Sequence, residues 1–186
     1  NLADFARSNH ATIAPGHVIG AGHAGIPAAN HTTATDLTIE AVCASGGRNG
    51  VSAQNFGRGH THVVTTGHIE GAASSGIRAI NFPGAMGLTV EAASATGGVY
   101  GVAAGNSGTG ATRVIATGHV EGVEEAGILA QNFAAATDLT VQAASAKGGL
   151  YGVYALNGGA GVAQGAATGD VVGGGRGGVL VGNDVG

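Results

Sequence analysis

The stretch that decides the fold is GILAQNFAAATDLTVQAASAKGGLYGVYALNGGAG, residues 127–161. It contains a Gly followed by a branched apolar residue, then an Asn five positions after that Gly, and it contains this arrangement twice. The Gly recurs at Gly25, Gly50, Gly76, Gly101, Gly127, Gly152 and Gly178, so that successive positions differ alternately by 25 and 26. The Asn recurs with it, at Asn30, Asn55, Asn81, Asn106, Asn132, Asn157 and Asn183. A repeat of this length predicts a solenoid of stacked, equivalent coils.

The residues between the Gly and the Asn alternate in character. Ile or Val comes one place after the Gly, at Ile26, Val51, Ile77, Val102, Ile128, Val153 and Val179. Ala or Val comes three places after it, at Ala28, Ala53, Ala79, Ala104, Ala130, Ala155 and Val181. A period of two predicts a β-strand whose small apolar side chains face inward.

Two further strands are predicted in each coil. In one, the expected inward columns are Leu37, Val63, Leu88, Val114 and Leu139, then Ile39, Thr65, Val90, Ala116 and Val141. The other is expected around Val18, Cys43, Ile69, Ser94, Val120, Ser145 and Val171. The fold class is therefore all-β, a parallel β-solenoid of about seven three-sided coils, each about 25–26 residues long.

The whole chain, residues 1–186, is expected to form a single solenoid segment. Residues 1–8 would end a preceding coil, and residues 9–186 would form seven coils in 51-residue two-coil repeats. VVTTGHIEG at 63–71 and VIATGHVEG at 114–122 illustrate the two-coil repeat. Because an open solenoid end exposes strand edges, we expect further coils of the same chain, or like subunits, at both ends.

The recurrent Asn and Gly are expected to have structural roles. Stacked Asn side chains can form a ladder in which each amide donates to and accepts from neighbouring coils. The Gly before each strand either adopts a positive φ or lets the backbone pass close to the adjacent wall.

Composition narrows the possible partners. The chain has 38 Gly, 4% aromatic and 10% charged residues, and a net charge of −4, which argues against a nucleic-acid partner. Cys43 is the sole cysteine, so no intramolecular disulfide can form. No cofactor is expected.

The stretch at 127–161 and ATGHVEGVEEAGILAQN at 116–132 resemble the β-strand repeats in passenger domains of bacterial autotransporters. This resemblance covers essentially the whole chain, although the Ala and His content is unusual for the family. It implies a right-handed parallel β-helix, exported through the outer membrane and located outside the cell or on the bacterial surface. It also implies a non-enzymatic structural or adhesive stalk, with a host-surface or carbohydrate ligand as a possible partner.

Two other functions compete with the stalk. Open ends that stack head to tail would make the chain a self-assembling fibre subunit. A polysaccharide lyase or hydrolase is the more distant alternative, since such enzymes also use parallel β-helices. Coil lengths that differ by only one residue leave no insertion to wall a cleft, so no catalytic residue is predicted.

The histidines suggest metal binding, but their spacing argues against it. His17, His68 and His119 recur at the two-coil period, with Asp170 in the next place. Two coils separate them by roughly 9.6 Å, more than the roughly 4 Å that two ligands of one zinc ion span. We therefore expect solvated turns and no metal site.

Two charge-balancing pairs between coils are also predicted. The first places His62 beside Asp36 and Gly87, with His60 on the same face, and the second places Arg113 beside Asp138. If exposed, each pair would contribute about 0 to 1 kcal/mol.

One candidate contact patch comprises exposed Leu, Ile and Tyr on a charge-poor wall. Its residues are Ile80, Tyr100, Leu129, Tyr151, Tyr154, Leu156 and Leu180. The patch would make lateral contacts with another stalk or a host ligand; alternatively, the Tyr rings only cover the Gly-rich corner.

Overall fold

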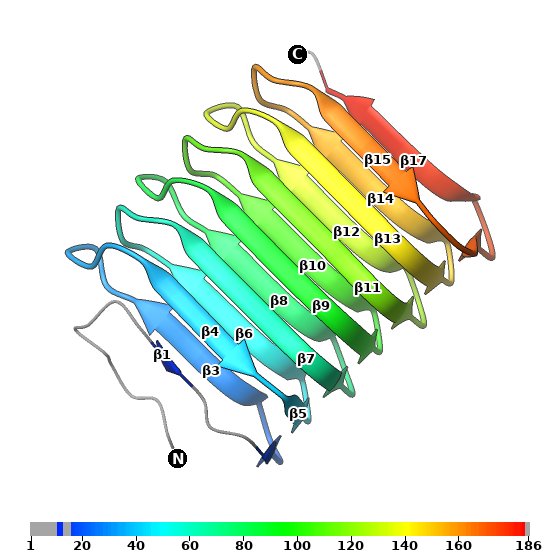
Figure 1. The fold of residues 1–186 in the computed structure, drawn as a ribbon, viewed down its shortest axis with the longest axis horizontal. Helices are drawn as coiled ribbons and strands as arrows, with labels where there is room; N and C mark the ends of the chain where they lie inside the picture. The colour runs from blue at the N-terminus through cyan, green and yellow to red at the C-terminus, as the bar shows by residue number, and fades with distance from the viewer. Residues whose placement is uncertain (1–10, 13–15, 185–186) are drawn as a thin grey trace.

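A computed structural model describes residues 11–12 and 16–184 of the chain. These residues form a solenoid of parallel strands with no helix, coil stacked upon coil (Figure 1). The predicted all-β solenoid of about seven coils is confirmed. No helix in the described residues is long and apolar enough to cross a membrane.

Two parallel sheets form the walls. The first, sheet A, has ten strands: β1 (Ala11–Thr12), β2 (His17–Gly20), β4 (Leu37–Ala41), β5 (Cys43–Gly46), β7 (Thr61–Gly71), β9 (Leu88–Gly97), β11 (Thr112–Gly122), β13 (Leu139–Gly148), β15 (Ala163–Ala167) and β16 (Val171–Gly173). The second, sheet B, has seven strands: β3 (Ala24–Asn30), β6 (Asn49–Asn55), β8 (Ser75–Asn81), β10 (Tyr100–Asn106), β12 (Ala126–Asn132), β14 (Tyr151–Asn157) and β17 (Gly177–Asn183).

Sheet B consists of the strands predicted between each Gly and Asn. Its strands pair in the predicted register, Gly-to-Asn segment against Gly-to-Asn segment. Its apolar columns are paired from Ile26 to Val179 and from Ala28 to Val181. In both columns the residues of the first six coils, which end with Val153 and Ala155, are buried. In the last described coil Val179 is 52% exposed, because no described strand pairs with the outer edge of β17.

Sheet A contains both of the other predicted strands. In β7, β9, β11 and β13 they run together as one strand of ten or eleven residues, with a register shift near Thr65–His68 and Ala116–His119. The longer strands, β7 and β11, carry one extra residue at this shift. Such a bulge bends the strand locally.

For the N-terminal half of each long sheet A strand, the predicted alignment was wrong by two residues in alternate coils. Leu37 pairs with Thr61, which pairs with Leu88, whereas Val63 pairs with Ile39 and Val90. The observed columns are Leu37–Thr61–Leu88–Thr112–Leu139 and Ile39–Val63–Val90–Val114–Val141. The prediction placed Val63 eight residues after Asn55, whereas Leu37 comes seven residues after Asn30. In the structure the turns after Asn55 and Asn106 are instead one residue shorter, so that Thr61 and Thr112 take this place, each six residues after its Asn.

The second half of sheet A also differs from the prediction. The inward column is Val18–Ala44–Ile69–Ala95–Val120–Ala146–Val171. Cys43, Ser94 and Ser145 stand one residue earlier, in an outward column with the histidines. This shift of one residue decides the chemistry of the outer face.

The recurrent Gly is the second residue of each sheet B strand, and it allows a close approach of the two walls. A methyl group at Gly50 would lie 2.4 Å from Cγ2 of Ile69, and one at Gly101 would lie 2.4 Å from Cγ1 of Val120. Neither Gly has a positive φ, which among the described residues occurs at Gly16, Gly84 and Gly177. Of the two predicted roles, close approach is therefore the one that the structure supports.

Candidate functional site

The predicted Asn ladder is present and continuous. Each of its seven members pairs in register with the next along sheet B. The first six are buried, and Asn183 in the last described coil is exposed.

The Asn amides mainly close the turn that follows them in their own coil. Asn81 Nδ2 donates to the carbonyls of Met86 (3.2 Å) and Gly87 (3.0 Å). Asn106 Nδ2 donates to the Gly110 carbonyl at 2.9 Å, while its Oδ1 accepts from the Gly108 N–H at 2.9 Å. One direct ladder bond is found in the described residues, from Asn30 Nδ2 to Asn55 Oδ1 at 3.4 Å. The predicted exchange of hydrogen bonds between neighbouring coils is therefore found at this pair of ladder residues, while the other ladder amides that donate in the described residues bond to turn carbonyls of their own coil.

Two aspartates link the turn after the Asn in one coil to the same turn in the next coil. Asp36 Oδ1 accepts a hydrogen bond from the backbone N–H of His60 at 2.7 Å, and Asp138 Oδ1 accepts one from Val162 at 2.9 Å. The predicted His62–Asp36 and Arg113–Asp138 pairs are therefore wrong, as a consequence of the sheet A register.

The side chains of those two pairs have other partners. His62 lies between Thr38 and Thr89, with Nε2 at 3.9 Å from Glu91 Oε1. Arg113 pairs with Thr140 in the sheet and donates to Gln142 Oε1 at 3.4 Å.

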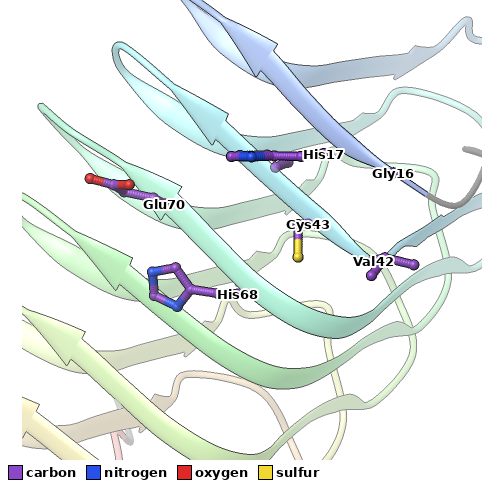
Figure 2. Close-up of a pocket in the computed structure, with 7 residues that line it drawn as sticks. Gly16, His17, Val42, Cys43, His68 and Glu70 are labelled. Atoms are coloured by element: carbon purple, nitrogen blue, oxygen red, sulfur yellow. The ribbon is translucent and has the colours of Figure 1, made fainter.

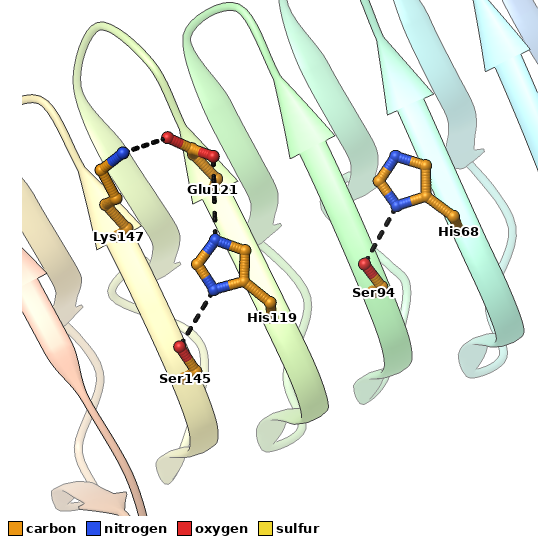
Figure 3. A network of polar contacts seen from close by, with 6 residues as sticks. All are labelled: His68, Ser94, His119, Glu121, Ser145 and Lys147. Carbon is orange, nitrogen blue, oxygen red and sulfur yellow. Dashed lines mark hydrogen bonds and ion pairs between the residues drawn. The ribbon is translucent and has the colours of Figure 1, made fainter.

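The outer face of sheet A carries a column in which histidines alternate with small nucleophilic residues. The column runs His17, Cys43, His68, Ser94, His119 and Ser145. His68 Nδ1 lies 3.0 Å from Ser94 Oγ, and His119 Nδ1 lies 3.0 Å from Ser145 Oγ (Figure 3). The histidines of this column were predicted from their two-coil spacing, whereas Cys43, Ser94 and Ser145 were not predicted to lie beside them.

A better signal for these neighbours was present in the sequence. Every sheet A strand in this half ends on a paired Gly, at Gly20, Gly46, Gly71, Gly97, Gly122, Gly148 and Gly173. Aligning the coils on this column puts Cys43, Ser94 and Ser145 beside the histidines.

Charged side chains stand in a second outward column, two residues further along each strand. Glu121 Oε1 accepts from Lys147 Nζ at 2.7 Å, and Glu121 Oε2 lies 3.7 Å from His119 Nε2 (Figure 3). The hydrogen bond from Lys147 is the main cause of a lowered pKa at Glu121, with a smaller effect from His119. Glu70, one repeat earlier, pairs with Thr96 where Glu121 pairs with Lys147.

Ser145, His119 and Glu121 are the residue types of a hydrolytic triad, but the geometry does not favour catalysis. The carboxylate lies beyond hydrogen-bond distance of the ring, and all three side chains stand on a paired sheet surface. The backbone N–H groups of His119 and Ser145, which pair with each other in the sheet, are engaged in the ladder and so do not form an oxyanion hole.

A depression of about 280 Å³ lies at the N-terminal end of this face (Figure 2). Its lining residues are Gly16, His17, Val42, Cys43, Ala44, His68 and Glu70. With the side chains oriented as they are, no three His, Cys, Asp or Glu residues in the described part of the chain are arranged to hold a metal ion.

The predicted contact patch lies on sheet B and at its edge, and the structure divides it. Leu129, Tyr154 and Leu180 are consecutive in one outward column, and the rings of Tyr151 and Tyr154 are 4.8 Å apart. Leu156 projects from the same strand as Tyr154. These five residues form one cluster near the C-terminal end.

The other two members of the predicted patch stand apart from that cluster. Gly105 and Gln131 separate Ile80 from Leu156 in their column, and Ala126 separates Tyr100 from Tyr151. Tyr100 Oη donates to Glu125 Oε2 at 2.6 Å. Burial, followed by this hydrogen bond, raises the pKa of Tyr100 to about 12.

No protein-family model, curated protein or solved structure matches the chain.

Proposed function

We propose that the chain is a rigid, non-enzymatic stalk segment of a surface-displayed or secreted repeat protein. The observation that carries the proposal is the unbroken register of the Asn ladder through seven coils. At roughly 4.8 Å per coil, this stack makes a rod about 30 Å long. Coils whose lengths differ by only one residue, without insertions, favour length and stiffness over a shaped cleft.

The likeness of residues 127–161 to autotransporter passenger repeats supports a location outside the cell or on the bacterial surface, reached by export through the outer membrane. Within the stalk, the cluster of Leu129, Tyr151, Tyr154, Leu156 and Leu180 is the proposed adhesive surface. Tyr rings and apolar side chains on a charge-poor wall suit lateral contact with another stalk or with a host-surface ligand such as a carbohydrate.

Small-angle scattering of the purified chain tests the structural part of this proposal. The expected scattering is that of a folded particle whose dimension along the stack grows by roughly 10 Å when the two-coil unit at 76–126 is duplicated in frame. A compact particle whose length does not grow would contradict the stalk.

Turnover assays test the non-enzymatic part. Incubation with a panel of acidic polysaccharides should release no product. Turnover that is abolished by Asp36→Ala or Arg113→Ala would instead establish the lyase or hydrolase alternative.

A self-assembling fibre subunit is the second candidate, favoured by the surface of the coil that contains β17. Val179 is 52% exposed there, although its equivalents in the preceding coils are buried, and the outer edge of β17 is unpaired among the described residues. A further coil, from this chain or from a like subunit, would cover both. Concentration-dependent filaments in electron micrographs, abolished by Val179→Asp and retained in the surface control Thr66→Asp, would support the fibre, and monomers at high concentration would reject it.

A further inference from the structure

Cys43 lies between two histidines on the outer face of sheet A (Figure 2). β2 pairs with β5 so that His17 stands opposite Cys43. β5 pairs with β7 with Ala44 opposite Ile69, which places Cys43 beside His68. Three coils that are consecutive in the stack therefore present His, Cys and His in one row.

With Cys43 in the row, the distance between the two histidines no longer excludes a shared ligand site. His17 and His68 are two coils apart, roughly 9.6 Å, but Cys43 halves that gap to roughly 4.8 Å on each side. The thiol leans toward β7, because a methyl group at Gly67 would lie 2.8 Å from Cys43 Sγ. An ion bound at about 2.3 Å from this sulfur would lie near the middle of the row, within reach of an imidazole from either side.

Glu70 supplies a fourth donor. It follows His68 by two positions on the same strand, so both side chains project outward, and both line the depression that contains His17 and Cys43. Thr96 rather than a lysine pairs with Glu70 in the next coil, in contrast to Lys147 beside Glu121.

We propose that His17, Cys43, His68 and Glu70 form a binding site for a borderline-soft divalent metal ion of the Zn²⁺ class. Thiolate, imidazole and carboxylate together are the donors that such an ion takes in tetrahedral protein sites. Binding breaks the S–H bond of Cys43, releases the proton to solvent and forms the metal–sulfur bond.

The site requires two side-chain rotations. His17 Nε2 lies 3.1 Å from Ser45 Oγ, and His68 Nδ1 lies 3.0 Å from Ser94 Oγ. Both contacts are exposed, so water can replace the hydroxyls when the rings turn toward Cys43. The two metal–nitrogen bonds and the metal–thiolate bond stabilise the turned orientation.

The chain contains its own control for this site. Ser94 lies between His68 and His119, and Glu121 follows His119 by two positions, so the same four positions recur one two-coil repeat later with a hydroxyl in place of the thiol. A neutral hydroxyl is a poor ligand for a Zn²⁺-class ion. Cys43→Ser therefore gives the first site the residue that the fold already carries in the second.

Titration of the reduced protein with Co²⁺ tests the proposal. One equivalent should bind, with a thiolate-to-metal charge-transfer band in the near ultraviolet, and Zn²⁺ should displace it. Cys43→Ser should abolish the band and weaken binding more than about 100-fold, beyond the effect of losing a residue that only supports a ligand. His68→Gln should also weaken binding, whereas His119→Gln should not.

Circular dichroism should show that Cys43→Ser keeps the fold. No Co²⁺ uptake by the parent protein, or equal uptake by folded Cys43→Ser, would overturn the site.

Moving the thiol provides a second test. The double variant Cys43→Ser, Ser94→Cys should regain one equivalent of Co²⁺ and the charge-transfer band, more weakly because Lys147 competes for Glu121. Adding Lys147→Gln should strengthen this binding. A folded double variant that takes up no Co²⁺ would contradict the argument that the row of three coils creates the site.

Discussion

Thr61 Oγ1 donates a hydrogen bond to Asn81 Oδ1 at 2.5 Å, and both side chains are buried. The bond ties the first residue of β7 to the ladder residue at the end of the same coil. The equivalent atoms one two-coil repeat later, Thr112 Oγ1 and Asn132 Oδ1, are buried but have no hydrogen-bond partner among the described residues.

This difference predicts unequal effects of one substitution. Thr61→Val should destabilise the protein by about 1 to 3 kcal/mol, because it leaves Asn81 Oδ1 buried and unpaired. Thr112→Val should change the stability little or raise it slightly, since it removes a hydroxyl that is already unpaired. Urea unfolding of the two variants provides the comparison, and equal losses would show that the two pairs are equivalent in solution.

The ladder itself should contribute through its turn hydrogen bonds. Asn106→Ala should lower the free energy of unfolding by about 1 to 3 kcal/mol, because the Gly110 carbonyl and the Gly108 N–H lose their partner. Asn81→Ala should have an effect of the same size. Asn183→Ala is the exposed control and should cost much less; a change near zero at Asn106 would mean that water replaces the amide.

The Gly at the second position of each sheet B strand should not tolerate a side chain. Gly101→Ala would put a methyl group 2.4 Å from Val120 Cγ1 and 2.7 Å from the Gly127 carbonyl oxygen. Overpacking of this kind costs about 1 to 3 kcal/mol. Gly22→Ala is the matched control, because nothing lies within 4 Å of its added methyl. Thermal unfolding should show a lowered midpoint for Gly101→Ala alone.

Tyr100 should make stability sensitive to alkaline pH. Its pKa is raised from 10.0 to about 12 in the fold, so the folded state holds the phenol proton more tightly than the unfolded chain. This contribution is complete below pH 10 and is lost as the pH rises toward 12. Alkaline absorbance titration should show a late-ionising tyrosine that disappears in Tyr100→Phe and ionises earlier in Glu125→Gln. An unchanged titration in Tyr100→Phe would assign the late step to another residue.

Glu121 should show the opposite dependence. Lys147 and His119 lower its carboxyl pKa, so its contribution is present above the ordinary Glu pKa and is lost as the pH falls through the lowered value. The pair is partly exposed, so we expect less than about 1 kcal/mol. NMR titration of the Glu121 carboxyl should give a pKa that rises in Lys147→Gln, while Arg113→Gln leaves it in place.

The sequence alone determined the repeat, the parallel β-solenoid and the register of sheet B. A constant spacing from Gly to Asn, with inward residues between them, allows only one in-register alignment, because a slip by one residue would turn Ile77 and Ala79 outward.

Only the tertiary structure decided the register of the sheet A residues that lie between the turn after each Asn and the bulge. The turn after Asn55 is one residue short and β7 carries one extra residue at its bulge, so these two changes offset each other and coil length does not reveal either. The hydrogen-bond partner of Asp36 depends on that register. The hydrogen bond from Thr61 to Asn81 depends on it too, because the short turn after Asn55 makes Thr61 the first residue of β7, where closure of the coil brings it to Asn81.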